Sequence, residues 1–207
     1  MRIVLISFLM LLPMFALARK AGKEAIKIGE MVWAKENLDV SYYRNGDEIR
    51  EAKTAAEWEE CGQKHIGCWC TYNNSYSSCG KLYNYYAVAD SRGLTPYGWH
   101  MPSAQELEYL VLTSGGKDNC GAELKARTGW KPGARNSGIN SWNGYGGGCR
   151  YSNGAFNYGG LIGYWWTSNA DTATHKVEVF NLYHDKDECA ISWFEKSFGF
   201  SVRCVRD

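Results

Sequence analysis

The feature that most constrains the fold is a series of short blocks rich in glycine, tryptophan and tyrosine between residues 82 and 207. Large aromatic rings fill a hydrophobic core, and glycine lets the backbone turn sharply where other residues would be strained. None of the blocks contains an obvious catalytic residue. They therefore indicate a structural scaffold more clearly than they indicate an activity. The blocks are 82–86, 98–103, 129–130, 146–150, 163–168 and 201–207.

Residues 1–18 have the pattern of a cleaved export signal. Arg2 supplies a positive end, residues 3–17 are nearly all apolar, and Ala16 and Ala18 are small residues at the expected cleavage positions. A membrane anchor is the alternative, but the apolar run is shorter than the roughly 20 residues that span a bilayer. We therefore expect a bacterial protein that is exported to the periplasm, the outer surface or the medium. No later segment is long and apolar enough to predict a transmembrane helix.

The mature chain is short enough to form one domain. Residues 19–27 are polar and rich in lysine, and we expect them to form a mobile leader before a domain that covers 28–207. The net charge is +1, and the basic residues are scattered. Since nucleic acids and anionic membranes attract a basic patch or stripe, neither is expected as the main partner.

Eight cysteines in an exported chain favour up to four disulfide bonds, because oxidising compartments form and keep such bonds. The sequence leaves the pairing open, but the cysteines divide into a crowded insert at 61–79 and a dispersed set, which suggests local pairs and body pairs. With His65, the insert could instead offer ligands to zinc, but its spacing lacks two Cys-x-x-Cys knuckles. The cysteines are Cys61, Cys68, Cys70, Cys79, Cys120, Cys149, Cys189 and Cys204.

The first half of the domain contains several local structural signals. Residues 31–34 predict a first strand, and 45–47 form a turn signal. A short helix is expected over 54–60, with Thr54 as its cap. The stretch 61–80 has no periodicity and predicts an irregular loop. From Leu82 onward, apolar residues recur at helical spacing, which predicts a helix that ends near Gly93.

The second half begins with a stronger helix signal. Ser103 and Glu106 form a capping box, and the apolar residues that follow lie on one face of a helix before Gly115. Residues 129–163 are so rich in glycine that we expect mostly loops, which in compact domains are often functional. Three strand-like runs follow at 164–168, 176–183 and 200–205. Early helices and late paired strands predict an α+β fold.

The order and spacing of these blocks resemble the Fibrobacter succinogenes major paralogous domain family of bacterial surface and secreted proteins. The resemblance covers 28–207, and only the cysteine-rich insert at 61–79 departs from the pattern. It implies a C-type-lectin-like fold, in which two helices flank a small twisted antiparallel sheet and long glycine-rich loops can bind ligands. It implies no particular activity. The matching segments are 33–38, 80–85, 92–103, 124–125, 129–130, 147–150, 154–156, 164–168 and 201–207.

Catalytic and metal chemistry find weak support in the sequence. A calcium site would need converging acids, and the usual lectin triplets are missing, although Asp171, Asp185, Asp187 and Glu188 could serve as ligands. Sulfatase-modifying enzymes, which share the expected fold, use a reactive cysteine pair that lies close together near their C-terminal end. Here Cys189 and Cys204 lie far apart in the sequence. We therefore expect no enzyme, no cofactor and no bound metal.

Carbohydrate recognition fits the residues of the glycine-rich loops better. Exposed aromatic faces stack on sugar rings, while amide and guanidinium groups bond to the hydroxyls. The candidate ligand-binding residues are Trp142, Asn143, Tyr145, Arg150, Tyr151 and Tyr158. We thus predict a non-enzymatic binding or adhesion module for polysaccharide or a surface protein. The alternatives are a structural subunit of a cell-surface assembly and a sulfatase-modifying-like enzyme.

Overall fold

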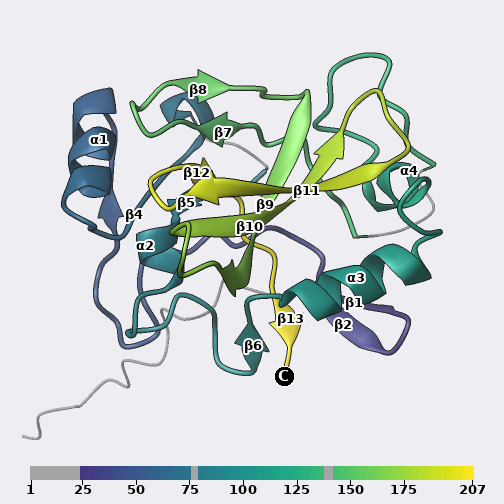
Figure 1. Cartoon of the computed structure of the whole chain (residues 1–207), viewed down its shortest axis with the longest axis horizontal. Helices are drawn as coiled ribbons and strands as arrows, with labels where there is room; N and C mark the ends of the chain where they lie inside the picture. The colour runs from purple at the N-terminus through teal and green to yellow at the C-terminus, as the bar shows by residue number, and fades with distance from the viewer. Residues whose placement is uncertain (1–23, 76–78, 138–141) are drawn as a thin grey trace, which may run out of the picture.

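A computed structural model describes residues 24–75, 79–137 and 142–207 (Figure 1). The expected signal peptide, most of the leader and short parts of the insert and of the glycine-rich loops lie outside these residues. In chain order the elements are β1 (Ala25–Ile28), β2 (Met31–Ala34), β3 (Arg50–Glu51), α1 (Ala55–Gln63), β4 (Cys68–Cys70), the 3-10 helix η2 (Tyr72–Asn74), β5 (Leu82–Asn84), α2 (Tyr85–Val88), β6 (Trp99–His100), α3 (Ala104–Thr113), α4 (Cys120–Leu124), β7 (Cys149–Arg150), β8 (Phe156–Asn157), β9 (Ile162–Ala170), β10 (Lys176–Tyr183), β11 (Cys189–Glu195), β12 (Gly199–Phe200) and β13 (Val205–Arg206). The mixture of helices and mostly antiparallel strands shows the expected α+β class.

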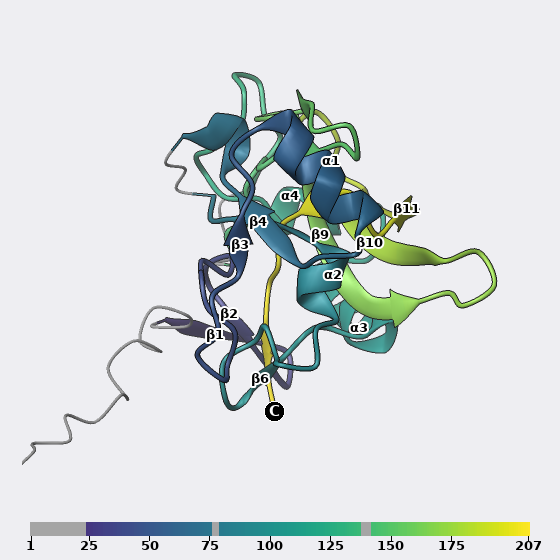
Figure 2. The ribbon, with the colours of Figure 1, turned by 90° about the vertical axis from the view of Figure 1, so that its left-hand side faces the viewer.

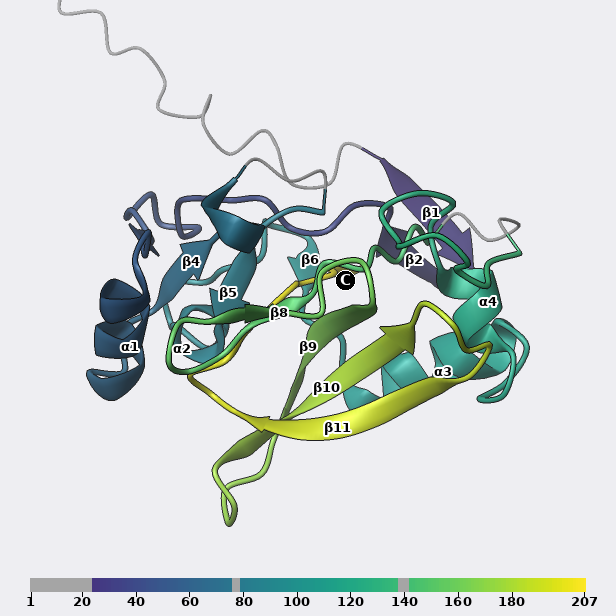
Figure 3. The ribbon, with the colours of Figure 1, turned by 90° about the horizontal axis from the view of Figure 1, so that it is seen from above.

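The longest strands form a three-stranded antiparallel sheet in the order β11-β10-β9. Figure 3 shows these strands side by side across the middle of the molecule. The central strand β10 is buried on both faces from Val177 to Leu182, and it separates two parts of the core. The sequence predicted β9 and β10 but not β11. The turn between β9 and β10 extends away from the body, as Figure 2 shows.

A second sheet joins the two ends of the domain in the order β1-β2-β13-β6. The first strand, β1, pairs in register with β2, from Ala25 opposite Ala34 to Ile28 opposite Met31. The leader expected at 19–27 is therefore too long, because residues 25–27 belong to this sheet. Lysine at position 27 obscured the strand in the sequence, but a strand at the edge of a sheet tolerates one polar face.

The cysteine-rich insert contributes a strand to a third sheet, whose order is β3-β4-β5-β12-β7-β8. The strand β4 lies parallel to β3 and antiparallel to β5. The prediction of an irregular loop over 61–80 was therefore wrong for this part of the insert. Cys68 and Cys70 are buried on one side of β4, and cysteine behaves as a small apolar residue in such positions.

Capping boxes begin both longer helices. The sequence predicted the box at Ser103 and, at Thr54, a cap without its partner Glu57. In α1 the Thr54 side chain accepts from the Glu57 N–H and the Glu57 carboxylate accepts from the Thr54 N–H, and Ser103 and Glu106 do the same in α3. Each box satisfies two backbone donors that the first helical turn leaves open. Four α-helices are present in the described residues, against the two that the resemblance implied.

The helix predicted from Leu82 to Gly93 was wrong in its first turn. Leu82 belongs to β5, and only α2, a single turn, follows it. The helical spacing of apolar residues gave a wrong prediction here. Every residue of β5 is buried, so the strand lacks the usual alternation of buried and exposed residues. The Asn84 side chain caps α2 by accepting from the Ala87 N–H. Its oxygen also accepts from the N–H of Cys68 in β4.

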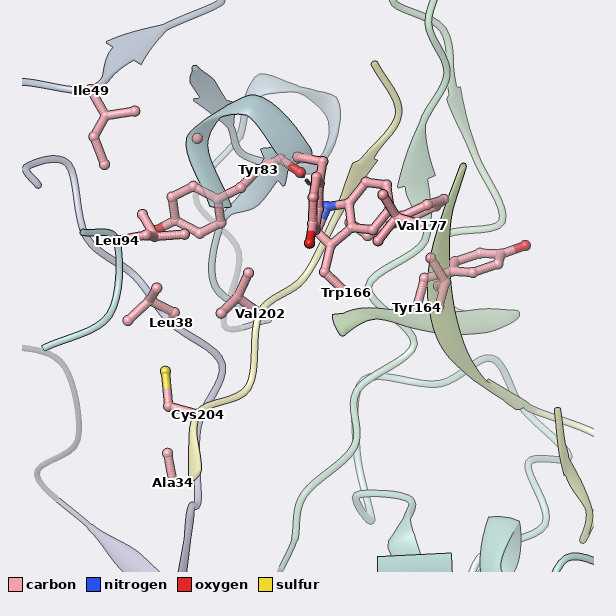
Figure 4. Packing of buried hydrophobic residues seen from close by; sticks show 14 of the residues in the cluster. Ala34, Leu38, Ile49, Tyr83, Leu94, Tyr164, Trp166, Val177, Val202 and Cys204 are labelled. Carbon is pink, nitrogen blue, oxygen red and sulfur yellow. Dashed lines mark hydrogen bonds between the residues drawn. The ribbon is translucent and has the colours of Figure 1, made fainter. Parts of the chain in front are cut away.

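The main core packs aromatic residues from several elements together (Figure 4). Trp166 of β9 is fully buried and donates its indole N–H to the carbonyl of Tyr83, a bond of 2.7 Å. Phe200 stacks on Tyr164 with 4.9 Å between ring centroids. The aromatic blocks therefore do fill the interior, as the sequence suggested for this part of the chain.

Candidate functional site

Arg150, one of the six candidate ligand-binding residues, lies in the interior and is 1% exposed. Its guanidinium donates to the carbonyls of Ala52, Thr54 and Gly154 at 2.6, 2.8 and 3.1 Å, and it lies 4.9 Å from the ring centroid of Trp58. The guanidinium thus joins the β7 turn to the segment before α1. Because these contacts use its donors and its face, Arg150 is a structural residue.

Two more candidates, Trp142 and Asn143, contact a second buried guanidinium, that of Arg203. Arg203 is fully buried and donates to the side-chain oxygen of Asn37 through Nε at 3.0 Å and Nη2 at 2.6 Å. It also donates to the carbonyls of Trp142 and Asn143. Trp142 is fully buried, and its ring contacts Trp165 at 4.9 Å between centroids. The prediction that Trp142 faces a ligand was therefore wrong. The backbone carbonyl of Asn143 is an acceptor for the buried Arg203.

Tyr145 lies on another part of the surface and is half-buried. Its hydroxyl lies 3.5 Å from the Glu36 carboxylate. Burial, and next the neighbouring Glu36 charge, raise the pKa of Tyr145 to about 12. The ring packs on Gly129, where a Cβ atom would lie 2.9 Å from it. Tyr145 therefore covers a turn of the scaffold.

The remaining two candidates, Tyr151 and Tyr158, lie together at the surface. Their ring centroids are 6.4 Å apart, and Tyr158 is 42% exposed. The neighbouring Tyr158 hydroxyl, followed by burial, raises the pKa of Tyr151 to about 12. A tyrosine pair of this kind offers both apolar ring faces and polar edges to a ligand.

The backbone holds Tyr158 in a conformation that few side-chain-bearing residues adopt. Its φ angle is +62°, in the left-handed region. Its carbonyl accepts from the N–H groups of Leu161 and Ile162 at 2.9 and 3.0 Å, which fixes the turn between β8 and β9. Strained positions of this kind concentrate at functional sites, so the conformation supports a role for this side chain.

Two phenylalanines that the sequence analysis missed extend the tyrosine pair. Phe198, from the turn between β11 and β12, lies 5.3 Å from both Tyr151 and Phe194 of β11, measured between ring centroids. Both phenylalanines are partly buried and pack against the main core through Phe200. We call Tyr151, Tyr158, Phe194 and Phe198 the aromatic surface. Phe194 shares its face of β11 with Ala190 and Ser192, so no apolar alternation revealed it in the sequence.

The elements under the aromatic surface are paired strands. In Figure 1 the β7–β8 hairpin lies beside β12, and the order β12-β7-β8 within one sheet agrees with this view. Tyr151 follows β7 and Tyr158 follows β8, while Phe198 precedes β12. Strand pairing therefore holds three rings from distant parts of the sequence in one place.

Metal ligands do not gather in the part of the chain that the structure describes: no group of three or more histidine, cysteine or acidic side chains could hold an ion there. All four acids named as possible calcium ligands have other partners. Glu188 accepts from Lys186 at 3.1 Å, and Asp185 lies 3.4 Å from the His184 ring. Asp171 accepts from the N–H of Ala173 at 2.7 Å, and Asp187 accepts from Arg135 at 3.0 Å.

The cysteines of the described residues form no disulfide bond in the structure. In two pairs, Cys61 with Cys68 and Cys120 with Cys189, each thiol is the main cause of the shift in the other's pKa. Cys149 and Cys204 are buried, and burial raises the pKa of each to about 12. The prediction of disulfide bonds therefore stays a prediction.

Fold and surface together define a class: an α+β domain with buried aromatic rings and buried cations inside and one aromatic surface outside. The chain belongs to the Fibrobacter succinogenes major domain family, whose sequence model matches residues 26–206. No curated protein and no solved structure gives a significant match. None of the helices within the described ranges is both long and apolar enough to cross a bilayer.

Proposed function

We propose that this protein is an exported, non-enzymatic binding module that recognises polysaccharide through the aromatic surface. The observation that carries the proposal is the tyrosine pair, in which Tyr158 is exposed, has a left-handed backbone conformation and lies 6.4 Å from Tyr151 between ring centroids. A sugar ring presents an apolar face bordered by hydroxyls, which matches aromatic faces that carry phenolic groups at their edge.

The neighbouring phenylalanines support this proposal. Phe198 packs against Tyr151 and Phe194 packs against Phe198, so little side-chain freedom is lost when a ligand binds. Several neighbouring rings suit an extended chain of sugar units better than a single monosaccharide. Polysaccharide is therefore preferred here over a surface protein.

The C-type-lectin-like fold is part of the same proposal. Three features are consistent with the arrangement that the family resemblance implies: helix α3, the antiparallel sheet β11-β10-β9 and the loop-rich segment before β9. The aromatic surface involves the end of that loop-rich segment, where such folds hold ligands.

The first prediction concerns binding to polysaccharides. The mature chain is passed over a panel of immobilised plant and bacterial polysaccharides, together with Tyr158→Ala and the control Tyr97→Ala. Tyr97 is 77% exposed but lies before β6, away from the aromatic surface. On the retained glycan, Tyr158→Ala should weaken affinity at least about tenfold, or about 1.4 kcal/mol. Tyr97→Ala should bind as wild type, and no retention on any glycan would sink the proposal.

A structural subunit of a cell-surface assembly is the second candidate function. The edge strand β11 pairs only with β10, and it exposes Ile191 by 48% and Trp193 by 42% on one face. A second copy of the chain could pair along this edge. Light scattering of the purified protein tests the idea: a defined oligomer that Trp193→Lys dissociates supports it, and a monomer at high concentration rejects it.

A further inference from the structure

We propose that the oxidised protein contains two specific disulfide bonds, Cys120 with Cys189 and Cys61 with Cys68. The sequence left the pairing of the eight cysteines open. The structure places each of the two pairs in its own buried cluster.

Backbone hydrogen bonds hold Cys120 and Cys189 side by side. The N–H of Cys189 donates to the carbonyl of Lys117 at 3.1 Å, and the N–H of Gly121 donates to the carbonyl of Asp187 at 2.8 Å. These bonds tie the start of α4 to the start of β11 on both sides of the two cysteines. The carbonyl of Lys117 also accepts from the Cys120 thiol at 3.9 Å, and both cysteines are buried in the same cluster.

The second pair lies between α1 and β4. The N–H of Ile66 donates to the carbonyl of Cys61 at 2.8 Å, which turns the chain back toward the helix. The Asn84 amide donates to the Cys68 sulfur at 3.2 Å and fixes its position, while the Cys68 thiol reaches Cys61. The hydrogen bond from Cys68, with help from the Arg50 charge, lowers the pKa of Cys61 to about 7.

The chemistry needs an oxidant that is itself a disulfide, either a small molecule such as oxidised glutathione or a thiol–disulfide oxidoreductase. One cysteine thiolate attacks a sulfur of that disulfide, forms a mixed disulfide and expels a thiolate, which takes up a proton. The neighbouring cysteine then loses its proton and attacks the mixed disulfide. The product is one protein disulfide and two reduced thiols of the oxidant. Since the sulfurs are buried in the folded chain, exchange occurs while the chain folds.

Of the two proposed disulfide bonds, the one between Cys120 and Cys189 should stabilise the folded protein more. It closes a loop of about 70 residues, and longer loops lose more entropy in the unfolded chain when they are closed. It also anchors α4, which has only five residues and no side-chain cap on its backbone N–H groups.

Peptide mapping tests the pairing on the full mature chain, refolded with a mixture of reduced and oxidised glutathione. Remaining thiols are blocked in denaturant with N-ethylmaleimide at about pH 6.5, where disulfide exchange is slow, before digestion with trypsin. We expect peptide 118–125 linked to 187–196, and peptide 54–64 linked to the Cys68 position of 65–81, with Cys149 and Cys204 blocked. Full blocking of Cys120 or Cys61, or a link from either to another cysteine, overturns that pair.

Thermal unfolding supplies a second readout. A reductant should lower the Tm of the oxidised wild type by about 5–15 °C. Cys120→Ser/Cys189→Ser should lose most of this response, and the control Cys149→Ser/Cys204→Ser should keep it. If the first variant fails to fold, the wild-type peptide map still decides the pairing. An unchanged response in a folded Cys120→Ser/Cys189→Ser protein contradicts the proposal.

Discussion

At the residue scale, buried cations hold the structure together. The guanidinium groups of Arg150 and Arg203 and the ammonium of Lys125 donate to backbone carbonyls inside the protein. Lys125, for example, bonds to the carbonyls of Tyr183 at 2.7 Å and Lys186 at 2.5 Å, and burial lowers its pKa to about 8. Each cation thereby satisfies oxygens that loop backbone leaves without a partner.

The sequence could not predict these roles. Arginine is usually exposed, and on glycine-rich loops it favours a ligand-binding interpretation, which we applied to Arg150. Only the folded chain shows that the acceptors come from a distant segment, Ala52 to Thr54. Trp142 was misassigned for the same reason, since its neighbours in the core lie far from it in the sequence.

The second prediction concerns Arg203. Replacing it with methionine removes the donors that reach the carbonyls of Trp142 and Asn143 and leaves the Asn37 amide oxygen with the Trp165 indole N–H. This should cost about 3–5 kcal/mol in the free energy of unfolding. Lysine should restore only part of this, because its ammonium cannot reproduce the planar fork that reaches both sides of the site. Urea unfolding measures both variants. Equal stability of Arg203→Lys and wild type would contradict the geometric account.

A third prediction concerns His100, whose ring lies 2.7 Å from both the Glu106 and the Asp207 carboxylates. Burial alone lowers the pKa of His100, but the bonds to Glu106 and Asp207 outweigh it and the net pKa is raised. The folded state therefore binds the proton more tightly. This stabilisation is fully present below about pH 6.5 and is lost as the pH rises through the raised pKa.

The measurement compares wild type with His100→Gln by urea unfolding at intervals between about pH 5.5 and 9. The stability advantage of wild type should be largest at the acid end and decline toward the basic end. Taking the difference removes the titration of other groups, such as Lys125. A difference that does not change with pH would show that protonation of His100 contributes nothing.

At the scale of elements, the cysteine-rich insert is built into the sheet and packs on the glycine-rich loops. The ring of Tyr72 in η2 lies against Gly148 and Gly159, and its hydroxyl accepts from the Gly159 N–H at 3.0 Å. A Cβ atom on Gly148 would lie 2.6 Å from that ring. The glycines thus allow the insert to approach the segment that carries the aromatic surface.

The fourth prediction follows from this contact. Gly148 and Gly46 both have positive φ angles, +63° and +95°, but only Gly148 meets neighbouring atoms where a Cβ would stand. Gly46→Ala should cost about 1 kcal/mol for the backbone conformation alone. Gly148→Ala should cost about 1–3 kcal/mol more because atoms must move apart. Equal losses in thermal or urea unfolding would show that the insert does not pack closely there.

Elements with local signals were predictable. The capping boxes at Thr54 and Ser103 lie within one helical turn, and β10 is defined by its own residues. Elements that depend on distant partners were not. The strand β4 is stabilised by β3 and β5, and β11 extends from the hairpin with β10, so neither has a decisive pattern of its own.

At the scale of the whole molecule, the residues that form the scaffold are mostly different from the residues of the candidate site. The matched region covers nearly all of the described chain, and its aromatic and basic residues mostly face inward. Of the six residues first proposed for ligand binding, only Tyr151 and Tyr158 meet at the surface. The sequence placed all six candidates in one loop region, but it could not separate exposed from buried rings, because burial depends on the packing of distant elements.

The central claim is that the tyrosine pair binds polysaccharide and can be removed without loss of the fold. The most direct test measures the Kd and the Tm of Tyr151→Ala/Tyr158→Ala on the same preparation, beside wild type and Tyr97→Ala. We predict a Kd at least about 100-fold higher, or about 2.7 kcal/mol, with a Tm within about 5 °C of wild type. An unchanged Kd, or a collapse of the Tm, would contradict the claim.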